Sequence, residues 1–225
     1  MDMPASDRKD EGTMDINRMK RNELLAATVI KGLTSRNMEG YYAATKEEAL
    51  KLALELIPEG SSVSWGGSMS IQEIGLKQAV IEGNYQVYNR DAASTPEEKR
   101  RIELATYDAD FFLTSSNAVT EDGILLNIDG NSNRVSAIAY GPKHVLMIVG
   151  MNKICKDVDA AVYRARNEAA TCNTQRFPIK TPCKVTGACA DCKSPDTICC
   201  QFLTTRYSRH AGRIKVILVG EDLGF

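Results

Sequence analysis

The sequence is short of histidine and of net charge. Its 225 residues include two histidines, His144 and His210, and neither lies in a pattern that predicts a catalytic base. Lysine and arginine total 28, against 29 aspartate and glutamate residues. A balance this even argues against nucleic acid or an anionic membrane as the main partner, while leaving room for a local basic pocket that binds a small anion.

Long apolar runs and common nucleotide-binding motifs are also missing. No apolar run approaches the roughly 20 residues that a membrane-spanning helix needs, and the polar start MDMPASDRKDEGTMD lacks the apolar core of a signal peptide. We therefore expect a cytoplasmic protein whose thiols stay reduced. The sequence contains neither a Walker loop nor a G-x-G-x-x-G fingerprint, so any hydride acceptor must lie on another molecule.

Length and composition set the scale of the fold. With 43% hydrophobic and 25% charged residues, the chain is long enough for one sizeable α/β core and too short for two. We predict a disordered tail at residues 1–15 and a single domain at 16–225, which contains a cysteine-rich surface loop at 180–202.

Helix-like and strand-like segments alternate along the chain. This alternation predicts a mostly parallel sheet covered by helices on both faces, and neighbouring β-prone runs after residue 124 suggest that part of the sheet is mixed. Capping residues support the helix starts at Thr45, Ser70 and Thr95. The predicted helices begin at residues 16, 45, 70, 95 and 157, and the predicted strands are 41–44, 62–65, 86–88, 110–114, 124–128, 135–140, 145–149 and 214–219.

Four of the seven cysteines form the sharpest local signal. Four thiolates can complete the shell of one metal centre, and such a site suits a [4Fe–4S] cluster and a structural Zn²⁺ alike. The spacing C-x5-C-x2-C-x6-C matches neither a bacterial ferredoxin nor a zinc ribbon, so the metal stays open; the alternative is a patch of free thiols. The predicted ligands are Cys183, Cys189, Cys192 and Cys199.

A glycine turn follows the predicted strand at 62–65. Gly66, Gly67 and Ser68 precede a helix, where unpaired backbone N–H groups favour an anion. The alternative is a turn that needs glycine only for its backbone angles.

A polar stretch at residues 115–134, SSNAVTEDGILLNIDGNSNR, is typical of a small-molecule site. It sets the ionic Glu121 and Arg134 among the amides Asn117, Asn127 and Asn133. Glu121 would act as a base or nucleophile if desolvated, and the alternative is a solvated glutamate at a turn.

The ends of the strand at 145–149 carry further candidates, because ligands gather at strand ends in open α/β sheets. Gly141 precedes this strand, and Asn152 follows it. A cationic patch for a phosphate or carboxylate would combine Arg134, Lys143, His144 and Lys153; the alternative is that the lysines are simply exposed.

Together these segments resemble the LUD family, named for lactate utilisation. The resemblance runs from about residue 17 to 225 and is most distinctive in SSNAVTEDGILLNIDGNSNRVSAIAYGPKHVLMIVGMNKI, residues 115–154, with support from WGGSMSIQEIGL, residues 65–76. It implies a Rossmann-like three-layer α/β fold of the NagB/RpiA/CoA-transferase-like type. It also implies one site at the sheet edge, formed by Gly66, Gly67, Ser68, Asn117, Glu121, Asn127, Asn133, Arg134, Gly141, Asn152 and Lys153.

The resemblance also implies a function, because LUD proteins of bacteria work beside an iron–sulfur subunit and a cysteine-rich subunit that oxidise L-lactate to pyruvate. We expect the chain to support oxidation of a small 2-hydroxy acid such as lactate, with a [4Fe–4S] cluster passing electrons and with Glu121 and Arg134 as catalytic candidates. The expected partners are a small anionic substrate and redox proteins; the oligomeric state stays open. The alternatives are a transferase, isomerase or ligase for a phosphate- or CoA-bearing molecule with structural zinc, or a non-catalytic subunit of a redox complex.

Overall fold

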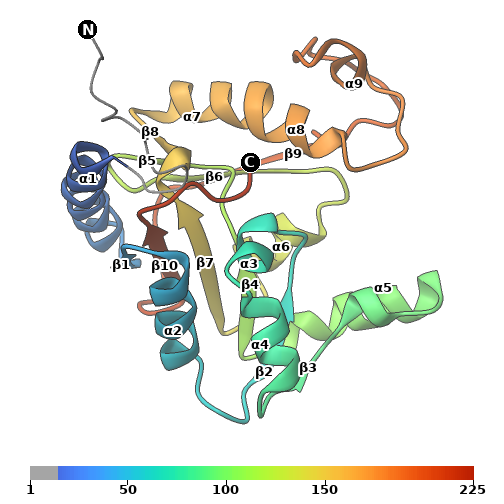
Figure 1. The fold of residues 1–225 in the computed structure, drawn as a ribbon. Coiled ribbons are helices and arrows are strands. Elements are labelled where there is room, and N and C mark those ends of the chain that lie inside the picture. Colours follow the sequence, from blue (N-terminus) through green and yellow to red (C-terminus); the bar gives the residue numbers. More distant parts are fainter. Residues whose placement is uncertain (1–14) are drawn as a thin grey trace, which may run out of the picture.

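The fold is built on a six-stranded sheet in which every pairing is parallel (Figure 1). The computed structural model describes residues 15–225, so the predicted tail lies outside the described residues except for Asp15, which caps the first helix. In spatial order the strands are β1 (Glu39–Ala43), β10 (Ile214–Val219), β7 (His144–Gly150), β4 (Phe111–Thr114), β2 (Ser62–Trp65) and β3 (Gln86–Val87).

Helices cover both faces of this sheet, as the alternating pattern predicts. Helix α1 (Ile16–Ser35) buries Ala26, Val29 and Leu33, whose spacing of three and four residues places them on one stripe. Helix α6 (Asn133–Ala139) packs on the same face. The opposite face is covered by α2 (Lys46–Leu56), α3 (Met69–Glu73) and α4 (Leu76–Glu82). The predicted three-layer α/β class is therefore confirmed.

A second, four-stranded sheet lies over the α1 face of the main sheet and is the mixed part of the fold. Its order is β8 (Ile154–Cys155), β5 (Ala118–Thr120), β6 (Leu125–Asp129) and β9 (Gln201–Thr205). Alternate residues face opposite ways along a strand. Val119 and Leu125 accordingly join the core of the main sheet, whereas Ala118 and Leu126 pack against a third layer.

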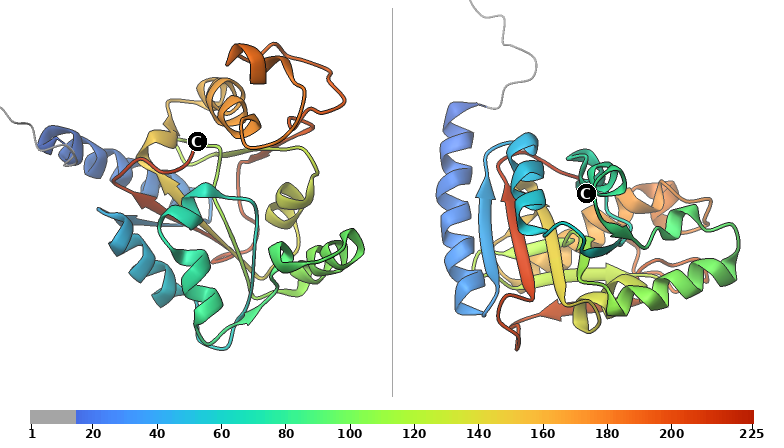
Figure 2. Two further views of the ribbon diagram at one scale, coloured as in Figure 1. Left: turned by 45° about the vertical axis from the view of Figure 1, so that its right-hand side comes forward. Right: turned by 90° about the horizontal axis from the view of Figure 1, so that it is seen from below.

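That third layer is one long helix with a widened turn. It consists of α7 (Val158–Arg164), the π-helical segment η4 (Ala165–Ala169) and α8 (Ala170–Thr174), and it crosses above the small sheet (Figure 1). The chain then forms α9 (Pro182–Thr186) and the cysteine segment before it returns as β9. Helix α5 (Pro96–Ala105) projects from the body elsewhere, as both views in Figure 2 show.

Two local predictions are wrong. The β-prone run 135–140 forms helix α6, because the Asp129 carboxylate accepts hydrogen bonds from the backbone N–H groups of Arg134 (2.9 Å) and Val135 (3.0 Å) and caps the helix. The helix predicted from Ser70 instead has Ser68 as its N-cap and is interrupted at Gly75, whose φ is 76°. Within the described residues, no helix is long and apolar enough to cross a membrane.

Candidate functional site

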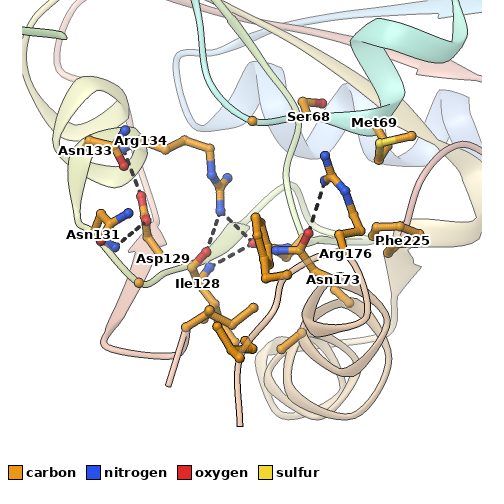
Figure 3. Close-up of a pocket in the computed structure, with 18 of the residues that line it drawn as sticks. Ser68, Met69, Ile128, Asp129, Asn131, Asn133, Arg134, Asn173, Arg176 and Phe225 are labelled. Atoms are coloured by element: carbon orange, nitrogen blue, oxygen red, sulfur yellow. Dashed lines mark hydrogen bonds between the residues drawn. The ribbon is translucent and has the colours of Figure 1, made fainter. Parts of the chain in front are cut away.

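A cavity of about 550 Å³ opens at the carboxyl end of the main sheet (Figure 3). The segments that follow β2, β4 and β7 all reach it, through Gly67 and Ser68, through Ser115 to Asn117, and through Lys153. The carboxyl ends of parallel strands meet at one edge, which is where open α/β sheets bind ligands. We call this space the central cavity.

Distant parts of the chain complete the walls of the central cavity. Lys99 and Glu103 come from helix α5, and Arg90 comes from the 3-10 turn Arg90–Ala92 that precedes it. Asn173 lies in α8, and Arg176 follows that helix. The cysteine segment adds a further wall with residues 195–198. The cavity therefore has walls from helix α5, from the end of α8 and from the cysteine segment.

Arg134 is anchored at the side of the central cavity by neutral oxygen atoms. Its Nη1 donates to the carbonyl of Ser115 (3.3 Å) and to Oδ1 of Asn127 (2.6 Å). Its Nη2 donates to Oδ1 of Asn117 (3.0 Å) and to the carbonyl of Ile128 (2.5 Å). Burial lowers the pKa of Arg134. The four terminal N–H groups are thus engaged, and Arg134 contributes chiefly a fixed positive charge.

Gly66 and Asn127, two of the predicted site residues, hold Arg134 in place. A Cβ atom at Gly66 would lie 3.0 Å from Cδ of Arg134, so glycine leaves the space that the arginine stem fills. Asn127 is fully buried, and its Nδ2 has no hydrogen-bond partner within residues 15–225. A buried amide nitrogen without a hydrogen-bond partner lowers the stability of the fold. The other end of the same amide, Oδ1 of Asn127, accepts a hydrogen bond from Arg134.

Lys153 lies at the floor of the central cavity, and no acidic side chain within residues 15–225 forms an ion pair with it. Its side chain is buried, and Nζ donates to the hydroxyls of Ser70 (2.9 Å) and Ser115 (3.1 Å). Burial, together with the nearby Arg164 and Arg134 charges, lowers the pKa of Lys153 to about 7. A primary amine of this kind is partly neutral near physiological pH.

The field inside the central cavity favours an anion. Arg164, itself buried, donates to the carbonyls of Asn117 (2.6 Å) and Asn152 (3.0 Å) beneath the floor. Five cationic and only three acidic side chains line the cavity, and the three acids are already engaged. In a chain with a formal net charge of −1, this local excess of positive charge favours an anion over a cation in the cavity.

The structure brings most of the predicted ligand-binding residues together. The central cavity is lined by Gly67, Ser68, Asn117, Asn133, Arg134 and Lys153. Asn117 has its Oδ1 held by Arg134 and by the N–H of Ile128 (2.9 Å), which leaves its Nδ2 as a donor. Asn152 stands behind the floor, where its Oδ1 accepts from the backbone N–H of Leu223 (3.1 Å).

Glu121 and Gly141 lie outside the central cavity. Glu121 follows the far end of β5 and pairs with Lys156 at 2.6 Å. Gly141, with a φ of 115°, packs against Tyr107 before the start of β7, at the opposite end of that strand from Lys153. Their predicted roles stay predictions, and we give them no part in the function proposed below.

The predicted cationic patch does not form as one group. Lys143 pairs with Asp110 at 2.7 Å, and Nδ1 of His144 lies 3.0 Å from the carbonyl oxygen of Gly212. Both residues lie at the amino end of β7, whereas Lys153 follows its carboxyl end. Lys143 and His144 therefore do not join Arg134 and Lys153 at the central cavity.

Sequence reasoning missed the outer walls of the central cavity. Arg90 and Arg176 reach it from segments whose relative placement depends on tertiary packing. Glu103 links two of these walls, because its Oε1 accepts from Arg90 (3.0 Å) and from Asn133 (2.9 Å). No motif in the sequence connects Arg90 or Arg176 with the strand-end residues of the site.

The four predicted metal ligands line a second, smaller cavity of about 70 Å³. Burial and then the neighbouring thiols raise the pKa of Cys199 to about 11. We call this space the cysteine cavity; its cysteines are Cys183, Cys189, Cys192 and Cys199. Cys200 does not line it and is exposed.

Polar groups surround the sulfur atoms of the cysteine cavity. Arg166, from the π-helical segment, donates from Nη2 to Sγ of Cys189 (3.5 Å) and to Oδ1 of Asp191 (2.6 Å). Sγ of Cys183 lies 3.3 Å from the hydroxyl of Thr181. Within residues 15–225, no group of three or more histidine, cysteine, aspartate or glutamate side chains is drawn together as a metal-ion site. Metal ligation by the cysteines therefore stays a prediction.

Comparison with known proteins places the chain in a family. The LUD domain profile matches residues 26–219. Among solved structures, a crystal structure of a DUF162 family protein from Deinococcus radiodurans is similar over 88% of this chain and 98% of that chain, with a TM-score of 0.52 and 11% sequence identity. At that identity the likeness shows the fold alone, and no curated protein matches the sequence. Since the profile match spans well over half of the chain, the protein belongs to the LUD domain family.

Proposed function

We propose that this LUD domain protein binds a small 2-hydroxy carboxylate, such as lactate, in the central cavity and takes part in its oxidation. The cysteine cavity would hold a [4Fe–4S] cluster that carries the electrons to a partner protein. One observation supports this proposal above all others. Ala170, Thr197 and Ile198 line both cavities, so a single wall separates the anion site from the four cysteines.

The cysteine cavity fits an iron–sulfur cluster better than a single zinc ion. A zinc ion draws four sulfur atoms to about 2.3 Å from one point and leaves no space between them. Here the four cysteines line a space of about 70 Å³ together with other side chains, among them Arg166 and Phe202. A cluster of four irons, each bound by one cysteine, holds its ligands farther apart. When bound, such a cluster supplies one-electron transfer.

The residues of the central cavity supply binding and proton transfer. The charges of Arg134 and Arg164 attract the carboxylate, and the free Nδ2 of Asn117 donates to it. Nζ of Lys153 lies beside the hydroxyl-bearing carbon and receives the hydroxyl proton. Oxidation of a 2-hydroxy acid to a 2-oxo acid releases two electrons and two protons. Lys153 takes the hydroxyl proton, so a redox partner must take the two electrons and the proton of the C–H bond.

Oxygen-free reconstitution with iron and sulfide tests the cluster. We expect four irons per chain with visible absorption, and we expect Cys199→Ser to lose iron. Cys200→Ser is the matched control, because Cys200 is adjacent in sequence but does not line the cysteine cavity. One zinc per chain without iron, or equal iron loss in both variants, would reject the redox proposal.

A second function is favoured by the size of the central cavity. About 550 Å³ far exceeds the volume of a three-carbon acid and falls in the range typical of larger ligands. A phosphate- or CoA-bearing substrate of a non-redox transferase, isomerase or ligase would fill it. Thermal-shift screening of lactate, sugar phosphates and acyl-CoA esters separates the two: stabilisation by the phosphate-bearing compounds alone would favour this alternative.

A further inference from the structure

We propose that Lys153 is a nucleophilic amine that forms an imine with the carbonyl carbon of a 2-oxo acid in the central cavity. This inference rests on the proposed function only in using the central cavity as a carboxylate site. It does not depend on a cluster in the cysteine cavity.

The surroundings of Lys153 separate it from an ordinary structural lysine. Buried lysines usually pair with a carboxylate. Nζ of Lys153 instead contacts two hydroxyls, of Ser70 at 2.9 Å and Ser115 at 3.1 Å, while it lines the central cavity. An ammonium has three donors, so one remains free of any partner within the described residues.

The charged groups that face Lys153 also favour the neutral amine. Arg164 and Arg134 lower its pKa after burial itself, and Glu73 is the one acid that raises it. The carboxylate of Glu73 is committed elsewhere, because its Oε2 accepts the backbone N–H of Gly224 at 2.9 Å. A lysine desolvated beside other cations is the kind that acts as a nucleophile.

The same cations that disfavour a charged lysine attract the substrate. A 2-oxo acid carries its carboxylate next to the carbonyl carbon. If the charge of Arg134 attracts the carboxylate and Nδ2 of Asn117 donates to it, the adjacent carbonyl carbon meets the floor where Nζ lies. The hydroxyl of Ser115 lines the cavity, and it would donate to the carbonyl oxygen as that oxygen gains negative charge, in place of its bond to the carbonyl of Ser116 (3.3 Å).

The proposed step balances without an oxidant. The Nζ lone pair forms a bond to the carbonyl carbon, and a proton moves from nitrogen to the oxygen to give a carbinolamine. Loss of that oxygen as water leaves the C=N bond of the imine. Water reverses the step, so the protein is regenerated.

Trapping with cyanoborohydride tests the proposal. The full chain is incubated with pyruvate, the simplest 2-oxo acid, and the reduced adduct is located by peptide mass spectrometry. We expect the adduct on Lys153, with a rate that rises through about pH 7. At neutral pH an unshifted lysine is neutral in only about one molecule in 3,000, so Lys153 should exceed exposed lysines in labelling by at least about a hundredfold.

Two variants make the test specific. Lys153→Met should lose the adduct while keeping a native circular dichroism spectrum. Lys156→Met should label as the unchanged protein does, because Lys156 is an exposed lysine paired with Glu121. Should Lys153→Met fail to fold, the site of the adduct and its pH profile in the unchanged protein still decide the matter.

Thermal shift with pyruvate separates failure of this inference from failure of the proposed function. Stabilisation by pyruvate without an adduct on Lys153 would overturn the imine and leave the carboxylate site intact. If pyruvate gives neither stabilisation nor an adduct, both the imine and the carboxylate site are refuted. An adduct spread evenly over exposed lysines, or one on Lys153 that forms only near the pH of ordinary lysines, would also refute the proposal.

Discussion

Replacing the buried amine of Lys153 by an apolar side chain should change the pH dependence of stability. The pKa of this lysine falls from 10.5 to about 7 on folding, which corresponds to about 5 kcal/mol at about 1.4 kcal/mol per pKa unit. Between these two values the unfolded chain binds a proton that the folded chain does not. The free energy of unfolding therefore rises as pH increases from about 7 to about 10.5, and this gain in stability is lost as pH falls back toward 7.

Lys153→Met removes this titration and keeps a similar side-chain length. We expect the variant to be the more stable protein at about pH 6.5 and its advantage to shrink by about 2–3 kcal/mol on going to about pH 9. The pH-dependent part is the decisive quantity, because loss of the two serine contacts adds a term that does not vary with pH in this range.

Urea unfolding provides the measurement. Trp65 is the single tryptophan and is buried, so its fluorescence reports global unfolding. Reductant is present throughout, because the chain has seven free cysteines. If the stability difference between the two proteins stays constant from about pH 6.5 to about pH 9, the amine is protonated as in water and the reasoning about its neutral form fails.

Three further substitutions test the scaffold of the site. Gly66→Ala should displace Arg134, since the new Cβ would lie 3.0 Å from Cδ; we expect a loss of about 1–3 kcal/mol in urea unfolding and weaker anion binding by calorimetry, and an unchanged affinity would contradict the assigned role. Asp129→Ala removes the cap of helix α6 and should cost about 1–2 kcal/mol, measured as a lowered urea midpoint. Gly123 has a φ of 87°, and a Cβ atom added there would lie 2.4 Å from the backbone nitrogen of Leu33. Gly123→Ala should therefore lower the melting temperature more than either of the other substitutions. An unchanged melting temperature would refute the close packing of α1 on the β5–β6 turn.

The sequence predicted the sheet well because its strong signals are local. The strands at 145–149 and 214–219 are near-continuous apolar runs, as expected for parallel strands that are buried on both faces. Helices with a threonine cap, at Thr45 and Thr95, begin where their capping residues indicate. The run at 135–140 failed because a carboxylate six residues earlier, on β6, decides its conformation against its β propensity.

The candidate site was predictable only at the strand ends. Ser68, Asn117 and Lys153 each follow a strand of the same parallel sheet, so their convergence is a consequence of topology. Arg90 and Arg176 reach the same cavity from segments about 85 residues apart, and no spacing rule connects them. The ionic character of Glu121 is visible in the sequence, whereas its place outside the cavity and its pairing with Lys156 are not.

The π-helical segment Ala165–Ala169 determines the relative orientation of the central cavity and the cysteine cavity. Arg164, just before it, supports the floor of the central cavity, whereas Arg166 within it faces the cysteines. An ordinary helix advances about 100° per residue, so removing one residue here would rotate everything downstream by that angle. Asn173 and Arg176 would swing out of the central cavity, and the cysteine segment would be carried with them. The number of residues in this helix thus determines how the central cavity and the cysteine cavity are oriented relative to each other.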